Sequence, residues 1–156
     1  MTKRVRSTPW AVIAAVMLVV LAVGGGALYA FYARRGGERG APQLEVTPMV
    51  QDLGTIDYRD GIVTLSFTVE NRGTGDLIIK EMETSCGCTK ASLVVNGREG
   101  PWFGMRGHGE WPRGWSATLK PSKRAELKVT YDPLAHGPYV GSFDRLVFIY
   151  WLCRNP

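Results

Sequence analysis

The chain has 156 residues and a formal net charge of +5, and 45% of its residues are hydrophobic. This length and composition suit one folded domain with a short extra segment, and they exclude an intrinsically disordered chain. Lys3, Arg4 and Arg6 supply three of the positive charges, whereas acidic and basic residues alternate over the rest of the chain. Because a nucleic-acid-binding protein usually has a dense basic face, we expect no nucleic-acid partner.

The first apolar run extends from Trp10 to Ala33 and contains no charged residue over its 24 positions. A helix of that length would span roughly 36 Å, which exceeds the ~30 Å hydrocarbon core of a bilayer. We therefore predict a cytoplasmic basic head over residues 1–9, a transmembrane anchor over residues 10–33 and a flexible linker over residues 34–42.

A cleaved signal peptide is the alternative interpretation of the same segment. It would use the basic start, the apolar stretch from Ala11 to Val23, and small residues suited to cleavage after Ala27. Apolar residues continue through Leu28 to Tyr32, however, which favours the anchor. A short basic head before one apolar segment is typical of exported or signal-anchored proteins, so we place the C-terminal domain outside the cytoplasm.

The region from Gln43 to Pro156 shows the period-two alternation of β-strands. Apolar and polar residues alternate from Val63 to Glu70 and again from Glu126 to Tyr131, as expected of half-buried strands. Residues 71–76 are rich in turn formers, so we predict a hairpin between the first of these strands and the next, at Leu77. Short strands without a long amphipathic helix indicate an all-β sandwich.

Leu146 to Trp151 is a continuous apolar and aromatic run that predicts a central strand.

A long loop rich in glycine and aromatic residues interrupts the alternation between Val95 and Lys120. Its rings either cap one end of the sandwich or serve as anchors for a binding partner. The candidate partner-binding residues are Trp102, Phe103, Trp111 and Trp115.

The most distinctive motif runs from Thr84 to Thr89 and reads Thr-Ser-Cys-Gly-Cys-Thr. Together with Phe67–Gly73 and Leu127–Pro133, it resembles the bacterial family catalogued as domain of unknown function 1573, over residues 44–150 approximately. The resemblance implies an Ig-like β-sandwich related to the ASH and major-sperm-protein group. Members of this family are commonly exported or membrane-attached, and interaction scaffolding is the role usually suggested for them.

The chain departs from the family pattern after Tyr150, where it reads Trp-Leu-Cys-Arg-Asn-Pro. We therefore expect the domain, residues 43–156, to lack its last strand. The edge left open would be an aggregation risk or a docking slot for a strand of a partner.

The cysteines allow three arrangements. Cys86 and Cys88 can form a small-ring disulfide, or one of them can pair with Cys153. In the third arrangement the two thiolates bind copper(I) or zinc together with His108 and His136, although the spacing is not a standard zinc signature.

We predict no enzyme, because the chain has no glycine-rich phosphate loop, no Gly-x-Ser-x-Gly elbow and no Cys-x-x-Cys motif at a helix N-terminus. The leading hypothesis is a membrane-anchored, single-pass, extracytoplasmic Ig-like module of the cell envelope that binds another envelope protein and needs no cofactor. The alternative is copper or zinc binding through Cys86, Cys88, His108 and His136. A thiol–disulfide enzyme is a third hypothesis.

Overall fold

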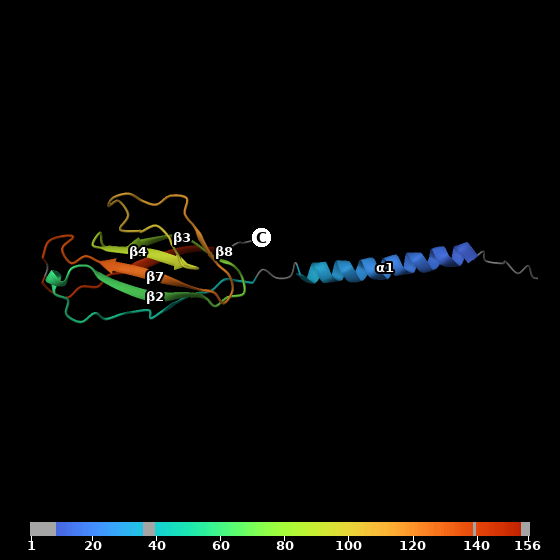
Figure 1. The fold of residues 1–156 in the computed structure, drawn as a ribbon, viewed down its shortest axis with the longest axis horizontal. Coiled ribbons are helices and arrows are strands. Elements are labelled where there is room, and N and C mark those ends of the chain that lie inside the picture. Colours follow the sequence, from blue (N-terminus) through green and yellow to red (C-terminus); the bar gives the residue numbers. More distant parts are fainter. Residues whose placement is uncertain (1–8, 36–39, 139, 154–156) are drawn as a thin grey trace, which may run out of the picture. The chain divides into compact units, whose positions relative to one another are not determined.

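The computed structural model describes residues 9–35, 40–138 and 140–153 (Figure 1). The chain divides into two compact units, residues 1–39 and residues 40–156, and each is described by itself. The predicted basic head, residues 1–9, falls almost entirely outside the described residues.

The described residues of the first unit form one helix, α1, over Pro9–Arg35. Its segment Val12–Ala30 is long and apolar enough to cross a membrane. Apolar side chains along this segment are exposed on all sides, and the helix runs without a break through Gly24–Gly26. A helix that is apolar all round suits a lipid environment. One N-terminal helix that could span a membrane is therefore confirmed, while cleavage after Ala27 stays an open alternative.

The second unit consists of two antiparallel sheets, which confirms the all-β prediction. The five-stranded sheet has the order β1 (Leu44–Thr47), β2 (Val63–Asn71), β7 (Arg124–Tyr131), β4 (Thr89–Val95) and β5 (Arg98–Glu99). The three-stranded sheet has the order β6 (Ala117–Leu119), β3 (Leu77–Thr84) and β8 (Val147–Cys153). A short 3-10 helix, η1 (Tyr58–Asp60), precedes β2.

The core lies between the two sheets. Alternate residues of each strand point inward, as the alternation of β2 and β7 predicted: Leu127 and Val129 are buried, whereas Glu126 is exposed. The buried apolar residues come from both sheets and the connecting loop: Val69, Leu77, Ile79, Met82, Ala91, Leu93, Phe103, Leu119, Ala125, Leu127 and Val129.

The domain begins earlier than the predicted boundary at Gln43. The Ala41 carbonyl accepts hydrogen bonds from the backbone N–H groups of Thr74 and Gly75, at 3.0 and 3.4 Å. A Cβ on Gly73 would overlap that carbonyl, so glycine is required for the close approach of the two segments. Residues 40–42, assigned above to the linker, therefore pack as part of the sandwich.

The predicted hairpin at residues 71–76 is wrong. β2 pairs with β1 and β7, whereas β3 pairs with β6 and β8 in the other sheet. The turn therefore crosses from one sheet to the other. The fully buried Asn71 holds this crossing, because its side-chain amide donates to the carbonyls of Gly75 and Leu119 at 2.7 and 2.9 Å.

The prediction of a central strand at Leu146–Trp151 is also wrong. β8 pairs with β3 and has no second neighbour among the described residues, so it is an edge strand there. Val147, Ile149 and Trp151 pack against the core, whereas the alternate side chains of Phe148, Tyr150 and Leu152 are 44%, 43% and 53% exposed. A continuous apolar run predicts burial on both faces, but here only one face is covered.

Candidate functional site

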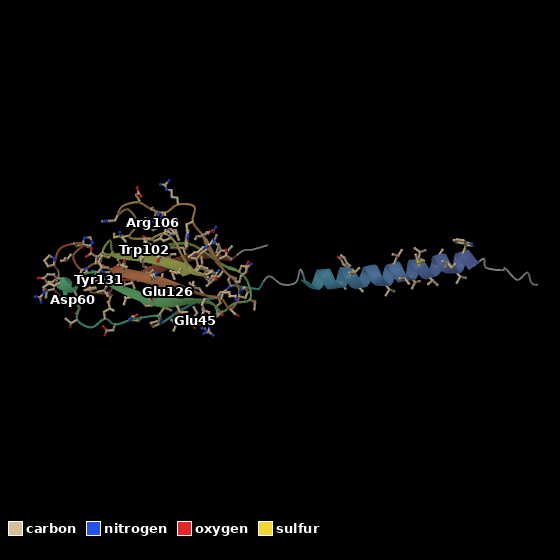
Figure 2. All side chains as sticks on the ribbon, in the orientation of Figure 1. Glu45, Asp60, Trp102, Arg106, Glu126 and Tyr131 are labelled. Carbon is tan, nitrogen blue, oxygen red and sulfur yellow. A yellow bond between two sulfur atoms is a disulfide. The ribbon has the colours of Figure 1, made fainter. Side chains whose placement is uncertain are left out.

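Strand register brings two connecting loops to one end of the sandwich. Thr89, the first residue of β4, lies opposite Tyr131, the last residue of β7. Thr84, the last residue of β3, lies opposite Val147, the first residue of β8. Residues 85–88, 132–138 and 140–146 therefore leave the sheets at the same end. Figure 1 shows the arrow of β7 leading into the orange-red segment at this end, and Tyr131 is labelled there in Figure 2.

Thr84 fixes the conformation of the turn that follows β3. Its buried hydroxyl oxygen lies 2.9 Å from the carbonyl oxygens of both Cys86 and Thr89, so it can donate its one hydrogen to either. The Thr84 N–H donates to the Gly104 carbonyl at 3.0 Å, which ties the turn to the aromatic loop. The neighbouring Ser85 N–H donates to the Leu146 carbonyl at 3.0 Å, which ties the turn to the start of β8.

The turn contains a disulfide between Cys86 and Cys88, whose Cα atoms are 5.2 Å apart. Cys88 is buried and Cys86 is half-buried. Arg145, just before β8, donates from Nε to the Cys88 sulfur at 3.2 Å. Cys153 lies opposite Leu77, at the other end of β3, roughly 20 Å of strand away from the turn. Of the pairings open to the sequence, the structure therefore has the bridge within the Cys-Gly-Cys turn.

Both histidines lie against this turn. The Sγ atoms of Cys86 and Cys88 and one ring nitrogen of His136 all lie within 4.8 Å of one another. A Cβ on Gly87 would lie 3.6 Å from Nδ1 of His108 and 3.7 Å from Nε2 of His136. The four residues named by the sequence as candidate metal ligands thus lie side by side. Metal binding itself stays a prediction.

Two backbone contacts explain why the histidine loops come here. The Asp132 N–H donates to the Cys88 carbonyl at 2.8 Å, which holds the loop containing His136 next to the Cys-Gly-Cys turn. The contact of Thr84 with Gly104 holds the loop that contains His108. The first contact continues the pairing of β4 with β7 beyond its last pair, and the second joins the end of β3 to the aromatic loop.

The aromatic loop mainly packs against the core. Phe103 is fully buried and exchanges two backbone hydrogen bonds of 2.8 Å with Ala91. Trp111 and Trp115 are half-buried and meet the Phe103 ring edge-on, with centroids 5.7 and 5.3 Å away. Phe103 therefore offers no surface to a partner, which corrects its assignment as a binding residue. Trp102, labelled in Figure 2, is the most exposed of the four at 37%.

The sequence analysis did not predict a role for two arginines of the site. Arg145 contacts the Cys88 sulfur, as described, and its guanidinium also lies 4.6 Å from the centroid of the Phe143 ring. Arg106 donates to Glu81 at 2.7 Å and lies 4.5 Å from the Trp111 ring centroid, and the Glu81 hydrogen bond raises the pKa of Arg106. Neither residue belongs to a motif, because its role depends on loops that only the fold brings together.

The outer face of β8 is apolar with one polar group. The Tyr150 hydroxyl donates to Glu83 at 3.1 Å, and this hydrogen bond is the main cause that raises the pKa of Tyr150. Tyr150 therefore stays uncharged at neutral pH.

The comparison with known families matches residues 44–96 to the family described as "Protein of unknown function (DUF1573)". Residues 44–96 of this chain are thus similar to the DUF1573 family. The match covers β1 to β4 and includes the Cys-Gly-Cys turn, but it ends before the aromatic loop, β6, β7 and β8. The DUF1573 match is therefore shorter than the resemblance to residue 150 inferred from the sequence. No curated protein and no solved structure matches the chain.

Replacing Thr84 by valine tests the anchor of the Cys-Gly-Cys turn. Valine keeps the shape but removes the hydroxyl, so the buried Thr89 carbonyl loses its side-chain donor, whereas the Cys86 carbonyl keeps the Thr89 N–H at 3.1 Å. We expect the free energy of unfolding to fall by about 1–3 kcal/mol, measured by urea unfolding of the full chain in detergent. Thr84→Ser should recover most of the loss, and Thr64→Val, at an exposed position of β2, should have little effect. Equal stability of Thr84→Val and Thr64→Val would contradict the role of the hydroxyl.

Proposed function

We propose that this protein is a membrane-anchored module of the cell envelope whose β-sandwich domain lies outside the cytoplasm and binds another envelope protein. It acts by binding and carries out no reaction of its own. The observation that carries the proposal is the apolar edge strand β8, on a domain whose chain also has a helix able to span a membrane.

The disulfide supports the extracytoplasmic location. Disulfides persist in oxidising compartments and are rare in the cytosol. The Cys86–Cys88 bridge lies in the same chain as the apolar helix α1. An exported domain held by α1 accounts for both features.

β8 combines two properties of a strand-docking site. Its outer backbone edge has no paired strand among the described residues, so its N–H and C=O groups on that side can pair with an added strand. Its exposed side chains Phe148, Tyr150 and Leu152 are apolar or aromatic, and Leu146 continues the row at 56% exposure. Such an edge is an aggregation risk when it is left uncovered.

We commit to one occupant, an extended segment of another envelope protein with apolar side chains at every second position. Pairing with β8 would place one face of that segment in line with Phe148, Tyr150 and Leu152. The seven residues of β8 give an edge of roughly 23 Å, enough to hold a strand of usual length. Backbone pairing would supply affinity, and the row of apolar side chains would supply specificity.

The location is tested by a fusion of bacterial alkaline phosphatase to the C-terminus of the full chain, because this enzyme is active only where its disulfides form. We expect active phosphatase in the membrane fraction, on a chain whose mass includes α1. A matched fusion that lacks residues 1–35 should be inactive. The location would be contradicted if the truncated fusion were active and the full-length fusion were inactive. An active chain cleaved after Ala27 would contradict the anchor.

The docking edge is tested by placing a photo-crosslinking amino acid at Phe148 or at Leu152 of the full chain in intact cells. We expect one discrete adduct, with the crosslinked peptide of the partner in an extended apolar-alternating segment. The adduct from position 148 should be lost when Leu152→Lys is added. The same crosslinker at Val50, which is 81% exposed and outside β8, is the control.

Three results would count against this interface. They are an equal adduct from Val50, no adduct from either β8 position, and an adduct of twice the chain mass, which would assign the edge to a second copy of this chain.

A further inference from the structure

We propose that the Cys86–Cys88 disulfide is the closed state of a copper(I) site, and that reduction opens the site by freeing two thiolates next to His136. This inference is independent of the interface at β8. It rests on the convergence of the two sulfur atoms and one imidazole nitrogen within 4.8 Å at one end of the sandwich.

The distances fit coordination after small movements. Metal–sulfur bonds of about 2.3 Å and metal–nitrogen bonds of about 2.0 Å place ligand atoms roughly 3.5–4 Å from one another. The His136 nitrogen lies no more than 4.8 Å from either sulfur, so it must move by roughly 1 Å at most, and reduction lets the two bonded sulfurs separate to the spacing that coordination requires. His136 is exposed on a loop and can make this movement, whereas Cys88 is buried and held by the Asp132 contact to its carbonyl.

The ligand set favours copper(I) over zinc. Thiolates are soft ligands that suit both copper(I) and zinc, but two thiolates with one imidazole give three ligands, which is enough for copper(I). A structural zinc site usually needs four protein ligands. His108 contacts the Gly87 position but is not one of the three residues whose ligand atoms lie within 4.8 Å of one another.

Arg145 adds an argument from charge. Two thiolates, one neutral imidazole and copper(I) have a net charge of −1, whereas the same ligands with zinc are neutral. The guanidinium of Arg145 already donates from Nε to the Cys88 sulfur at 3.2 Å. A cation next to a buried thiolate compensates the extra negative charge of the copper(I) complex.

Gly87 leaves room for the imidazoles. A Cβ at this position would lie at ordinary contact distance from both rings, 3.6 and 3.7 Å from the nearest nitrogens. Alanine therefore fits, whereas the atoms of a longer side chain would compete with the two rings for this space. Gly87 can thus be used to displace the histidines without removing a ligand.

Opening the site consumes a dithiol. One thiolate of the dithiol attacks the half-buried Cys86 sulfur, and the Cys86–Cys88 bond breaks with Cys88 leaving as a thiolate next to Arg145. The second thiol of the dithiol then attacks the mixed disulfide, releases Cys86 and closes the disulfide of the reductant. Two electrons reach the protein, and copper(I) binding leaves both cysteines as thiolates.

The test uses the full Cys153→Ser chain in detergent, which removes pairing through the third cysteine. The chain is reduced with a dithiol, freed of it without oxygen, and titrated with copper(I) against a coloured copper(I) chelator. We expect one equivalent of copper(I) to move to the reduced chain and none to the oxidised chain. X-ray absorption should show two sulfur ligands and one nitrogen ligand.

Substitutions distinguish the residues that would bind copper(I) from the residues that surround them. Cys86→Ser and Cys88→Ser should abolish copper(I) transfer, and His136→Ala should weaken binding by at least about 10-fold. Gly87→Leu should weaken it, whereas the matched Gly87→Ala should not. Circular dichroism checks that each variant is folded. If a serine variant unfolds, alkylation blocks the thiolates of the reduced parent chain instead, and copper(I) transfer should again be lost.

Four outcomes would overturn the proposal. They are transfer of copper(I) to the oxidised chain, no transfer to the reduced chain, full affinity of His136→Ala, and displacement of the bound copper(I) by an equimolar amount of zinc.

Discussion

The Thr84 hydroxyl, buried between the carbonyls of Cys86 and Thr89, is the contact on which this end of the domain depends. The chain must leave the three-stranded sheet after β3 and enter the five-stranded sheet at β4 within four residues. The Cys86 and Cys88 carbonyls accept backbone N–H groups, whereas the buried Thr89 carbonyl depends on a side-chain donor, and a buried carbonyl without a donor is costly. One threonine side chain supplies that donor, and its backbone N–H reaches the aromatic loop as well.

The same crossing brings the side chains of the candidate site to this end of the sandwich. Because Thr89 pairs with Tyr131 and Thr84 with Val147, the loop with His136 and the segment with Arg145 must both start beside the Cys-Gly-Cys turn. The aromatic loop reaches the turn through Gly104, and Phe103 is buried in the core beneath Trp111 and Trp115. The aromatic residues thus stabilise the loop that carries His108. The edge strand β8 is a separate surface, which begins near this end and extends along the sheet to Cys153.

Much of the fold could be predicted from local pattern. The alternation of Val63–Glu70 and Glu126–Tyr131 predicted which side chains face the core, and the apolar run before Arg34 predicted α1. Whether residues 71–76 form a hairpin or cross between the sheets could not be predicted, because turn-forming residues suit both. The partner of β3 lies some 70 residues away, in β8. The run at Leu146 was assigned to a central strand because composition cannot show that one face is uncovered.

The residue types of the candidate site were predicted from the sequence. Its geometry was not, because it depends on strand pairings between residues far apart in the sequence. Cys86 and Cys88 are a visible motif, whereas His108 and His136 stood out only because they are the two histidines of the chain. Arg145 was not predicted, since nothing local distinguishes it from the other arginines. Phe103 was misassigned because an aromatic residue in a loop has the same sequence signature whether it is buried or exposed.

The convergence of both histidines on Gly87 is the central structural claim, and nuclear magnetic resonance tests it most directly. In the oxidised full chain in detergent micelles, with glycine and histidine isotopically labelled, nuclear Overhauser effects should connect the Gly87 α-protons with ring protons of both His108 and His136. The account predicts both sets of effects, and it predicts that they disappear for the corresponding ring in His108→Ala or His136→Ala. The account would be contradicted if, in a folded chain, the ring protons of either histidine showed no nuclear Overhauser effect to Gly87.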